Sequence, residues 1–191
     1  MNVLTYVKKL GMTQQDLELI IIGCKKGDQA CFSQIVDLYG KRCFGYFYRL
    51  TGNREISEDL LSELFVKLVE KIAGYKGGSF DGWIFAMASN IFYDHLRFKQ
   101  RQSRLLDGHK RRLELDSSFA ENVPNDEADK MQAALGKLDA DVREVIIMRY
   151  YSQLSFKEIA ELRGEPIGTT LSKVHRGLKR LRELMGIMNY E

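Results

Sequence analysis

The stretch 155–185 constrains the fold most strongly, because its residues determine where two helices begin and end. Ser155 followed by Glu158 is a capping box, in which each side chain satisfies a free backbone amide at a helix start. The helix that begins after Ser155 must be short. Gly164 can adopt the left-handed conformation that terminates helices, and Pro166 cannot continue one.

A second helix is predicted from about residue 167, amphipathic along its whole length. Its apolar residues are spaced so that they form one stripe: Leu171, Val174, Leu178, Leu181 and Met185. The opposite face carries hydroxyl and basic side chains: Thr169, Ser172, Lys173, Arg176, Lys179 and Arg180. A short helix, a glycine turn and a basic second helix predict a helix-turn-helix that reads duplex DNA in the major groove. The alternative is a surface helix whose basic face is only solvated.

The composition favours an all-α protein with a packed core. Hydrophobic residues make up 45% of the 191 residues, there are only 2 prolines, and no segment alternates convincingly like a strand. The formal net charge of +3 is too small for general polyanion binding, so contact with nucleic acid must come from local patches.

Cysteine usage and hydropathy point to a cytosolic chain. The 3 cysteines are an odd number with no CxxC pair, which argues against a metal site or a disulfide framework. No apolar run reaches the roughly 18 residues that a membrane span requires. We therefore expect a cytoplasmic protein without membrane insertion, metal or cofactor.

Two further helices are predicted in the N-terminal half, after a first helix that starts at Thr13 and Asp16. One begins after Asp28, ends at about 50 before Gly52, and buries Phe32, Ile35, Val36, Tyr39, Phe44, Phe47 and Leu50. The next, 56–73, has an acidic face formed by Glu55, Asp59 and Glu63 beside Phe65, which we expect to be exposed. Like charges at this spacing repel one another. The face is either merely solvated or a docking surface for a basic partner.

The glycine-rich segment 74–79 predicts a loop, and Ser79 can cap a long helix that runs to about 104. Ile84, Ala88, Ile91 and Phe98 are expected to face the core of the protein. A separate stripe mixes aromatic, amide and basic side chains: Trp83, Met87, Asn90, Asp94, Arg97, Arg101 and Arg104. Such a mixture suits single-stranded nucleic acid. The alternative places Trp83 in the core and leaves the arginines solvated.

The chain resembles the extracytoplasmic-function (ECF) group of bacterial sigma-70 factors over about residues 27–100 and 131–185. The resemblance rests on GDQACFSQIVDLYGKR, YRLTGNREISEDLLSELFVKL, YKGGSFDGWIFAMASNIFYDHLR and the helix-turn-helix segment. Its most specific marks are Glu58-Asp59-Leu60 with Glu63 and Phe65, the series Trp83, Ala88, Asn90, Asp94 and Arg97, and Gly168-Thr169 with His175-Arg176.

The resemblance implies three binding surfaces and no catalysis. Asp59, Glu63 and Phe65 would bind the clamp coiled coil of the largest subunit of the RNA polymerase core. The flap region of the core is a further expected contact of this chain. The minus-ten element would be bound by Tyr75, Lys76, Ser79, Phe80, Trp83, Asn90 and Arg97. The minus-35 element would be read by Thr169, Ser172, Lys173, Arg176, Lys179 and Arg180. The resemblance also admits an anti-sigma factor as a partner. Ser62, where the family has Gln, is a departure that can retune the polymerase contact.

We expect two small helical domains joined by a flexible linker. The predicted division is an extension at 1–26, sigma region 2 at 27–104, a linker at 105–130 and sigma region 4 at 131–191. The linker prediction rests on an acidic stretch that follows the basic run 110–112.

The function predicted is that of an alternative sigma factor, which directs polymerase to promoters and assists their melting. Two other classes stay open on the residues alone. One is a stand-alone helix-turn-helix regulator, which would usually dimerise on a two-fold operator. The other is a metal-dependent nuclease or phosphotransferase that uses Asp59 and Glu63.

Overall fold

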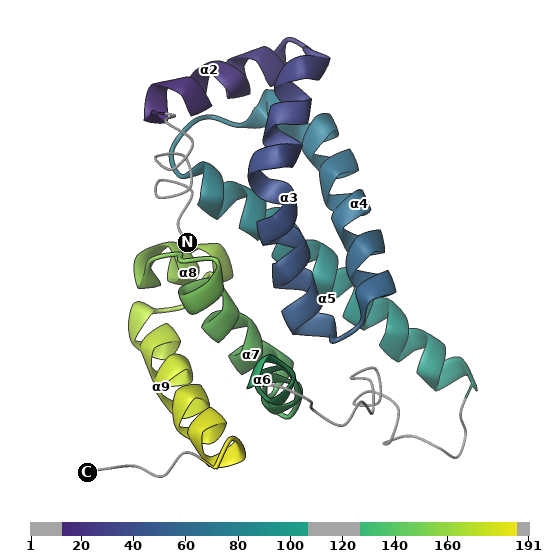
Figure 1. The fold of residues 1–191 in the computed structure, drawn as a ribbon, viewed down its shortest axis with the longest axis vertical. Helices are drawn as coiled ribbons and strands as arrows, with labels where there is room; N and C mark the ends of the chain where they lie inside the picture. The colour runs from purple at the N-terminus through teal and green to yellow at the C-terminus, as the bar shows by residue number, and fades with distance from the viewer. Residues whose placement is uncertain (1–12, 107–126, 187–191) are drawn as a thin grey trace.

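The structure is a computed structural model that describes residues 13–106 and 127–186, and within these ranges it consists of helices and turns (Figure 1). The helices of the N-terminal half are α2 (Gln14–Lys25), α3 (Gln29–Thr51), α4 (Arg54–Lys71) and α5 (Phe80–Leu106), with a short 3-10 turn at Ile72–Gly74. The C-terminal half contains α6 (Glu127–Gly136), α7 (Ala140–Ile146), a π-helical turn (Ile147–Tyr151), α8 (Phe156–Arg163) and α9 (Ile167–Leu184).

Helices α2 to α5 form a bundle whose ends are fixed by local capping. Thr13 and Asp16 form a capping box at the start of α2, and the side chain of Asn53 caps α4. Helix α3 ends at Gly52, whose φ of 66° lies in the left-handed region that glycine tolerates. The large side chains inside the bundle, including Tyr39 and Phe85, are fully buried, which stabilises the fold by roughly 1.5–3 kcal/mol for each large apolar side chain.

The C-terminal half contains the predicted helix-turn-helix. Ser155 and Glu158 form the expected capping box, and Gly164, with a φ of 62°, ends α8. Helix α9 lies against α7 at Gly177, where a Cβ atom would meet the side chains of Ile146 and Val142 at 2.5 Å. This glycine therefore sets how closely the two helices approach.

The two halves pack against each other. Helix α3 contacts α6, α7 and the π-helical turn, and α5 contacts α8. In Figure 1 the helices of the C-terminal half lie along one side of α3. Val145, Ile147 and Leu154 belong to the same buried cluster as the core of the N-terminal bundle. The N-terminal helix α2 is also part of this cluster through Leu17 and Ile20.

Two apolar residues predicted to lie in the core, and one predicted on the apolar stripe of α9, are exposed instead. Val36 is 44% exposed because the buried stripe of α3 passes through its neighbour Ile35. Phe98, in the second half of α5, is 53% exposed. Leu171 is 44% exposed, and Thr170 is buried in its place because its hydroxyl binds Glu165.

Some of the predicted segments can be compared with the structure only in part. The predicted linker, 105–130, overlaps the end of α5, which runs to Leu106, and the first turn of α6, which begins at Glu127. The rest of the linker, including the basic run 110–112, and the first part of the predicted N-terminal extension lie outside the described residues.

Candidate nucleic-acid and polymerase interfaces

Helix α4 presents the predicted acidic face to solvent. Asp59 and Glu63 are both exposed, and Glu63 forms an ion pair of 2.6 Å with Lys67 one turn later. Phe65, which we expected to be exposed, is half-buried and packs against the core. The apolar side chains that do reach solvent on this helix are Val66 and Val69, at 59% and 54% exposure.

The loop before α5 is held in a defined shape by its own side chains. The hydroxyl of Tyr75 donates to the carbonyl of Gly78 at 2.8 Å, while the backbone amide of Gly82 donates to Ser79 Oγ at 3.0 Å. Gly77 has a φ of 98° and Gly78 a φ of 93°, conformations that side chains rarely tolerate. The loop is therefore a compact turn with a thin, glycine-lined backbone.

Three aromatic rings predicted to contact the minus-ten element form a cluster under this loop. The ring centroids of Tyr75, Phe80 and Trp83 lie 5.2–5.5 Å apart. Tyr75 and Phe80 are buried and Trp83 is half-buried, so the cluster supports the loop as well as lining it. Lys76 and Ser79 are exposed at its surface.

Farther along α5 the predicted polar stripe is accessible. Asn90 is exposed, and so is Arg97, which pairs with Asp94 at 2.6 Å. Arg101 continues the same face. Met87, assigned to this stripe from the sequence, is instead buried in the core.

A cleft of about 560 Å³ adjoins the loop. It is lined by α2, by the loop itself and by residues of the C-terminal half that include Gln153 and Glu158. Ser79 Oγ donates a hydrogen bond of 2.6 Å to Glu158 Oε1 across it. Burial raises the pKa of Glu158, but the hydrogen bonds from Ser79 and Ser155 outweigh burial and bring this pKa below its ordinary value.

On α9 the predicted DNA-reading residues do not share one environment. Thr169, Ser172, Arg176, Lys179 and Arg180 are exposed. The Lys173 side chain is only 16% exposed, and its ammonium group lies 2.9 Å from Asp141 and 2.5 Å from Glu165. Lys173 is therefore held against the body of the protein, not presented on the exposed basic face.

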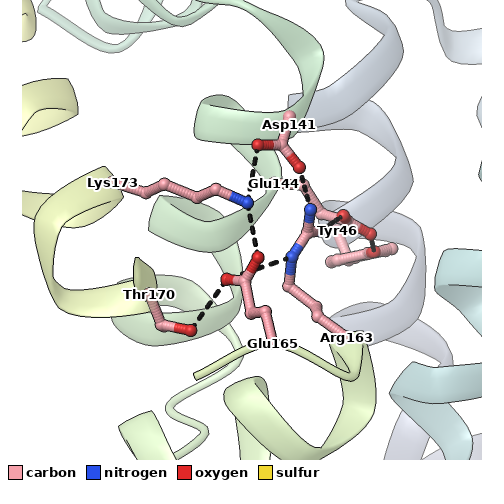
Figure 2. Close-up of polar contacts among 7 residues, drawn as sticks. All are labelled: Tyr46, Asp141, Glu144, Arg163, Glu165, Thr170 and Lys173. Atoms are coloured by element: carbon pink, nitrogen blue, oxygen red, sulfur yellow. Dashed lines mark hydrogen bonds and ion pairs between the residues drawn. The ribbon is translucent and has the colours of Figure 1, made fainter. Parts of the chain in front are cut away.

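Lys173 belongs to a network of charged groups that Figure 2 shows. Arg163 forms ion pairs with Asp141 and Glu144, and Thr170 donates to Glu165 at 2.8 Å. The remaining contact crosses to the N-terminal half, where Tyr46 donates to Glu144 at 2.6 Å. The network thus connects helix α9 with α3.

Burial dominates the protonation of Glu144, which is 0% exposed. It raises the pKa of this carboxyl, although the nearby hydroxyls of Ser89, Tyr46 and Tyr93 favour the charged form. Glu165 is less enclosed. Burial raises its pKa, but hydrogen bonds from Lys173 and Thr170 outweigh that effect and lower it overall.

Sequence reasoning missed the charged residues at the contact between the halves. Arg42 is 9% exposed and lies 2.9 Å from both Asp81 Oδ1 and the carbonyl oxygen of Ser152. Arg143 donates to the carbonyl of Leu50 at 2.7 Å. The sequence signal that could have revealed such residues is a charged residue on the apolar stripe of a helix, because a buried position is rarely charged unless the charge has a partner.

Within the ranges 13–106 and 127–186, His, Cys, Asp and Glu side chains nowhere gather in threes or more as a metal site would require. No described helix combines the length and the apolar character needed to cross a membrane.

Comparison with known proteins gives matches in both halves. Residues 35–102 match the family described as sigma-70 region 2, and residues 128–181 match sigma-70, region 4. SigW of Bacillus subtilis, an ECF RNA polymerase sigma factor, is 30% identical over 171 residues, which cover 83% of this chain and 91% of SigW. The RNA polymerase sigma factor CarQ of Myxococcus xanthus is 30% identical over 172 residues, covering 87% and 96%.

A longer relative and a solved structure agree with these matches. The ECF sigma factor SigE of Mycolicibacterium smegmatis is 31% identical over 166 residues, which are 83% of this chain and 64% of SigE. The structure of the sigma factor RpoE from Bartonella quintana, in complex with the anti-sigma factor NepR, superposes with a TM-score of 0.71. It is 27% identical and covers 83% of this chain and 98% of RpoE. The chain therefore belongs to the ECF group of the sigma-70 family of RNA polymerase sigma factors.

Proposed function

We propose that this chain, as an alternative sigma factor, uses three separate surfaces to direct the RNA polymerase core to promoters. The observation that carries the proposal is the segregation of exposed charge: acidic residues lie on α4 and basic residues on α9, in different halves of one chain. A basic protein and a DNA duplex can then be bound at the same time. In this proposal the chain acts in the cytoplasm and carries no catalytic step of its own.

The polymerase surface is the exposed face of α4. Asp59 and Glu63 repel each other one turn apart and slightly disfavour their own helix, so a partner gives the better account of their placement. Val66 and Val69 add apolar area next to the charges. A basic helical partner such as the clamp coiled coil of the largest polymerase subunit complements such a face, and Phe65 supports it from beneath.

The minus-ten surface combines the loop before α5 with the exposed side of that helix. The thin backbone at Gly77 and Gly78 lets a base taken out of the stack approach closely. Asn90 offers an amide for base edges, and Arg97 offers charge for phosphates. Tyr75, Phe80 and Trp83 form the aromatic floor, while Lys76 and Ser79 lie at the rim.

The minus-35 surface is the exposed face of α9. Thr169 and Ser172 lie near its N-terminus, where recognition helices contact base edges, and Arg176, Lys179 and Arg180 lie farther along. If these three cations each neutralise one phosphate, the salt slope is only about −2.7, at roughly −0.9 per phosphate. The free chain should therefore bind duplex DNA weakly.

Two further elements belong to the proposal. One is the division into an extension at 1–26, region 2 at 27–104, a linker at 105–130 and region 4 at 131–191, in which α2 belongs to the extension and packs on α3 of region 2. The other is an anti-sigma partner, proposed from the likeness to RpoE of Bartonella quintana, which was solved in complex with an anti-sigma factor.

A gel-shift on promoter DNA tests the proposal at about 150 mM salt, with and without core polymerase. The free chain should bind no tighter than the roughly 10⁻⁴ to 10⁻⁶ M of non-specific contacts. Added core should produce a specific complex and detectable melting, because joining two reading modules raises each one's effective concentration. Tight operator-like binding by the free chain, with no gain from core, would favour a stand-alone regulator instead.

A further inference from the structure

Helix α9 exposes two large apolar side chains in its first two turns. Ile167 is 50% exposed, and Leu171, one turn later, is 44% exposed. The helix packs on the protein through a different stripe, which consists of Thr170, Val174, Gly177 and Leu181. Single exposed apolar side chains are ordinary on protein surfaces, so the position of these two decides what they can do.

The pair lies on the part of α9 that is proposed to enter the major groove. Recognition helices contact base edges with the residues near their start, and Leu171 directly precedes the exposed Ser172 there. The hydroxyl of Ser172 donates to the carbonyl of Gly168 at 2.8 Å, which leaves the lone pairs of its oxygen as acceptors. Neighbouring residues therefore present an apolar surface and a hydrogen-bond acceptor together.

Basic side chains are scarce in the same two turns. Between Ile167 and His175, Lys173 is the only lysine or arginine. Its ammonium group is held between Asp141 and Glu165, as Figure 2 shows, and its side chain is only 16% exposed. Guanine is read most often by a bidentate Arg or Lys, so this part of the helix does not present the usual reader of a G·C pair.

Thymine is the base that matches an apolar reader. Its C5-methyl group projects into the major groove, where the other three bases present no methyl group. An A·T pair also offers the adenine N6 amino group as a donor, whereas a G·C pair offers a donor without a methyl group. Leu171 and the acceptor of Ser172 therefore complement an A·T pair in both respects.

The charges of α9 favour DNA over a protein as the occupant of this apolar surface. Arg176 and Lys179 are exposed farther along the helix, where they suit the phosphates that flank a groove. The helix carries no Asp or Glu before Glu183, close to its end at Leu184. The apolar pair is thus continuous with a surface that complements a polyanion.

We infer that Ile167 and Leu171 read thymine methyl groups in the minus-35 element, so that this chain selects A·T pairs where α9 enters the groove. The inference rests on the proposed function, since it assigns a base preference to the surface proposed to read that element. Leu171 is the principal contact because it adjoins Ser172, and Ile167 extends the apolar surface by one turn.

Selection with core polymerase supplies the DNA for the test. The chain is combined with core, and duplexes randomised across the minus-35 window are selected for binding, with A·T pairs expected to be enriched. Each thymine of the selected duplex is then replaced in turn by deoxyuridine, which keeps the base pair but lacks the methyl group. At a contacted thymine, binding should weaken roughly fourfold, the usual effect of burying one methyl-sized group.

Substitutions in α9 connect this loss to the proposed readers. Leu171→Ala should reduce the discrimination between thymine and deoxyuridine, and the double variant with Ile167→Ala should abolish it. Leu171→Met keeps an apolar side chain and should retain it. The matched control is Leu19→Ala, because Leu19 is 65% exposed on α2 and the same atoms are removed. This control should discriminate as the wild type does, and circular dichroism verifies that each variant is folded.

The outcomes separate the inference from the function on which it rests. If no deoxyuridine weakens binding by the wild type, or if the loss persists in the double variant, thymine reading is wrong. A lower affinity of Leu171→Ala for core polymerase without DNA would show that the apolar surface binds protein, which also overturns the inference. If the wild type with core selects no sequence at all, the proposed function itself fails.

Discussion

Tyr46 in α3 donates a hydrogen bond of 2.6 Å to Glu144 in α7, a carboxylate that is 0% exposed. The two residues lie 98 positions apart in the sequence and come from different halves of the chain. Glu144 also pairs with Arg163, so this hydrogen bond joins α3 to the charge network that reaches α9 (Figure 2).

Replacement of Tyr46 by Phe should destabilise the chain by about 1–3 kcal/mol, because a buried carboxylate oxygen loses its donor while the ring is kept. Urea unfolding followed by circular dichroism measures the change in the free energy of unfolding. The matched control is Tyr150→Phe, since Tyr150 is 56% exposed and its hydroxyl can bind water. Equal effects of the two substitutions would contradict the importance of the Tyr46 hydrogen bond.

The raised pKa of Glu144 predicts a particular dependence of stability on pH. Burial places the pKa of this carboxyl above its ordinary value of 4.5 in the folded chain. A group with a raised folded-state pKa stabilises the fold fully below its ordinary pKa, and this stabilisation is lost as pH rises through the folded pKa. Relative to Glu144→Gln, the wild type should therefore lose stability as pH rises above about 4.5.

Melting temperatures of both proteins, measured from pH 4 to pH 8, test this sign. The comparison with Glu144→Gln removes the contributions of Glu158 and Glu165, whose lowered pKa values act in the opposite direction in both proteins. Parallel curves for the two proteins would mean that Glu144 keeps an ordinary pKa in the folded chain.

The ends of the helices could be predicted from the sequence because capping is local. Ser155 and Glu158 are three residues apart, and the structure confirms their capping box and the end of α8 at Gly164. The contact between the halves could not be predicted in this way. Arg42 bonds a carbonyl 110 residues away, and nothing in the local spacing identifies that partner.

The candidate sites show the same limit. Helical spacing correctly placed Asp59, Asn90 and Arg176 on exposed faces. It could not show that Lys173 is held by Asp141, because that carboxylate lies on another helix. Nor could it show that Phe65 packs inward, because periodicity assigns a side of the helix but not what covers it.

Lys173 and Lys179 should therefore differ in their effects on DNA binding. Lys179→Ala removes an exposed cation, and the salt slope of non-specific duplex binding should fall in magnitude by about 0.9. Lys173→Ala removes a cation that is already paired with Asp141 and Glu165, so the salt slope should change little while stability falls. Fluorescence anisotropy across a salt series measures both slopes. Equal slopes for the two variants would indicate that Lys173 leaves its partners to bind phosphate.

Gly177 offers a test of how α9 packs on α7. A Cβ atom there would lie 2.5 Å from side-chain atoms of Ile146 and Val142, and overpacking of this kind costs about 1–3 kcal/mol. Gly177→Ala should lower stability by that amount, as measured by urea unfolding. Gly168→Ala on the same helix is the control, because its Cβ would meet no atom within 4 Å and alanine favours helices. A neutral Gly177→Ala would mean that the two helices can move apart easily.

Charge reversal on α4 separates partner binding from folding. Asp59 and Glu63 are exposed, and the single ion pair from Glu63 to Lys67 is worth only about 0.3–0.5 kcal/mol as a surface helix pair. The double variant Asp59→Lys with Glu63→Lys should thus unfold at nearly the wild-type temperature. Its affinity for core polymerase, measured by anisotropy with a labelled chain, should fall at least tenfold, because like charges then face each other across the contact.

The control for this experiment carries the same change in net charge at a different place. Asp37 on α3 and Glu161 on α8 are both exposed, and Asp37→Lys with Glu161→Lys leaves the face of α4 intact. If overall charge governed polymerase binding, the two double variants would lose affinity equally. If the α4 variant unfolds while the control does not, the acidic residues stabilise the fold. The assignment of α4 as the polymerase surface then fails. Retained stability with a selective loss of affinity supports α4 as the docking helix.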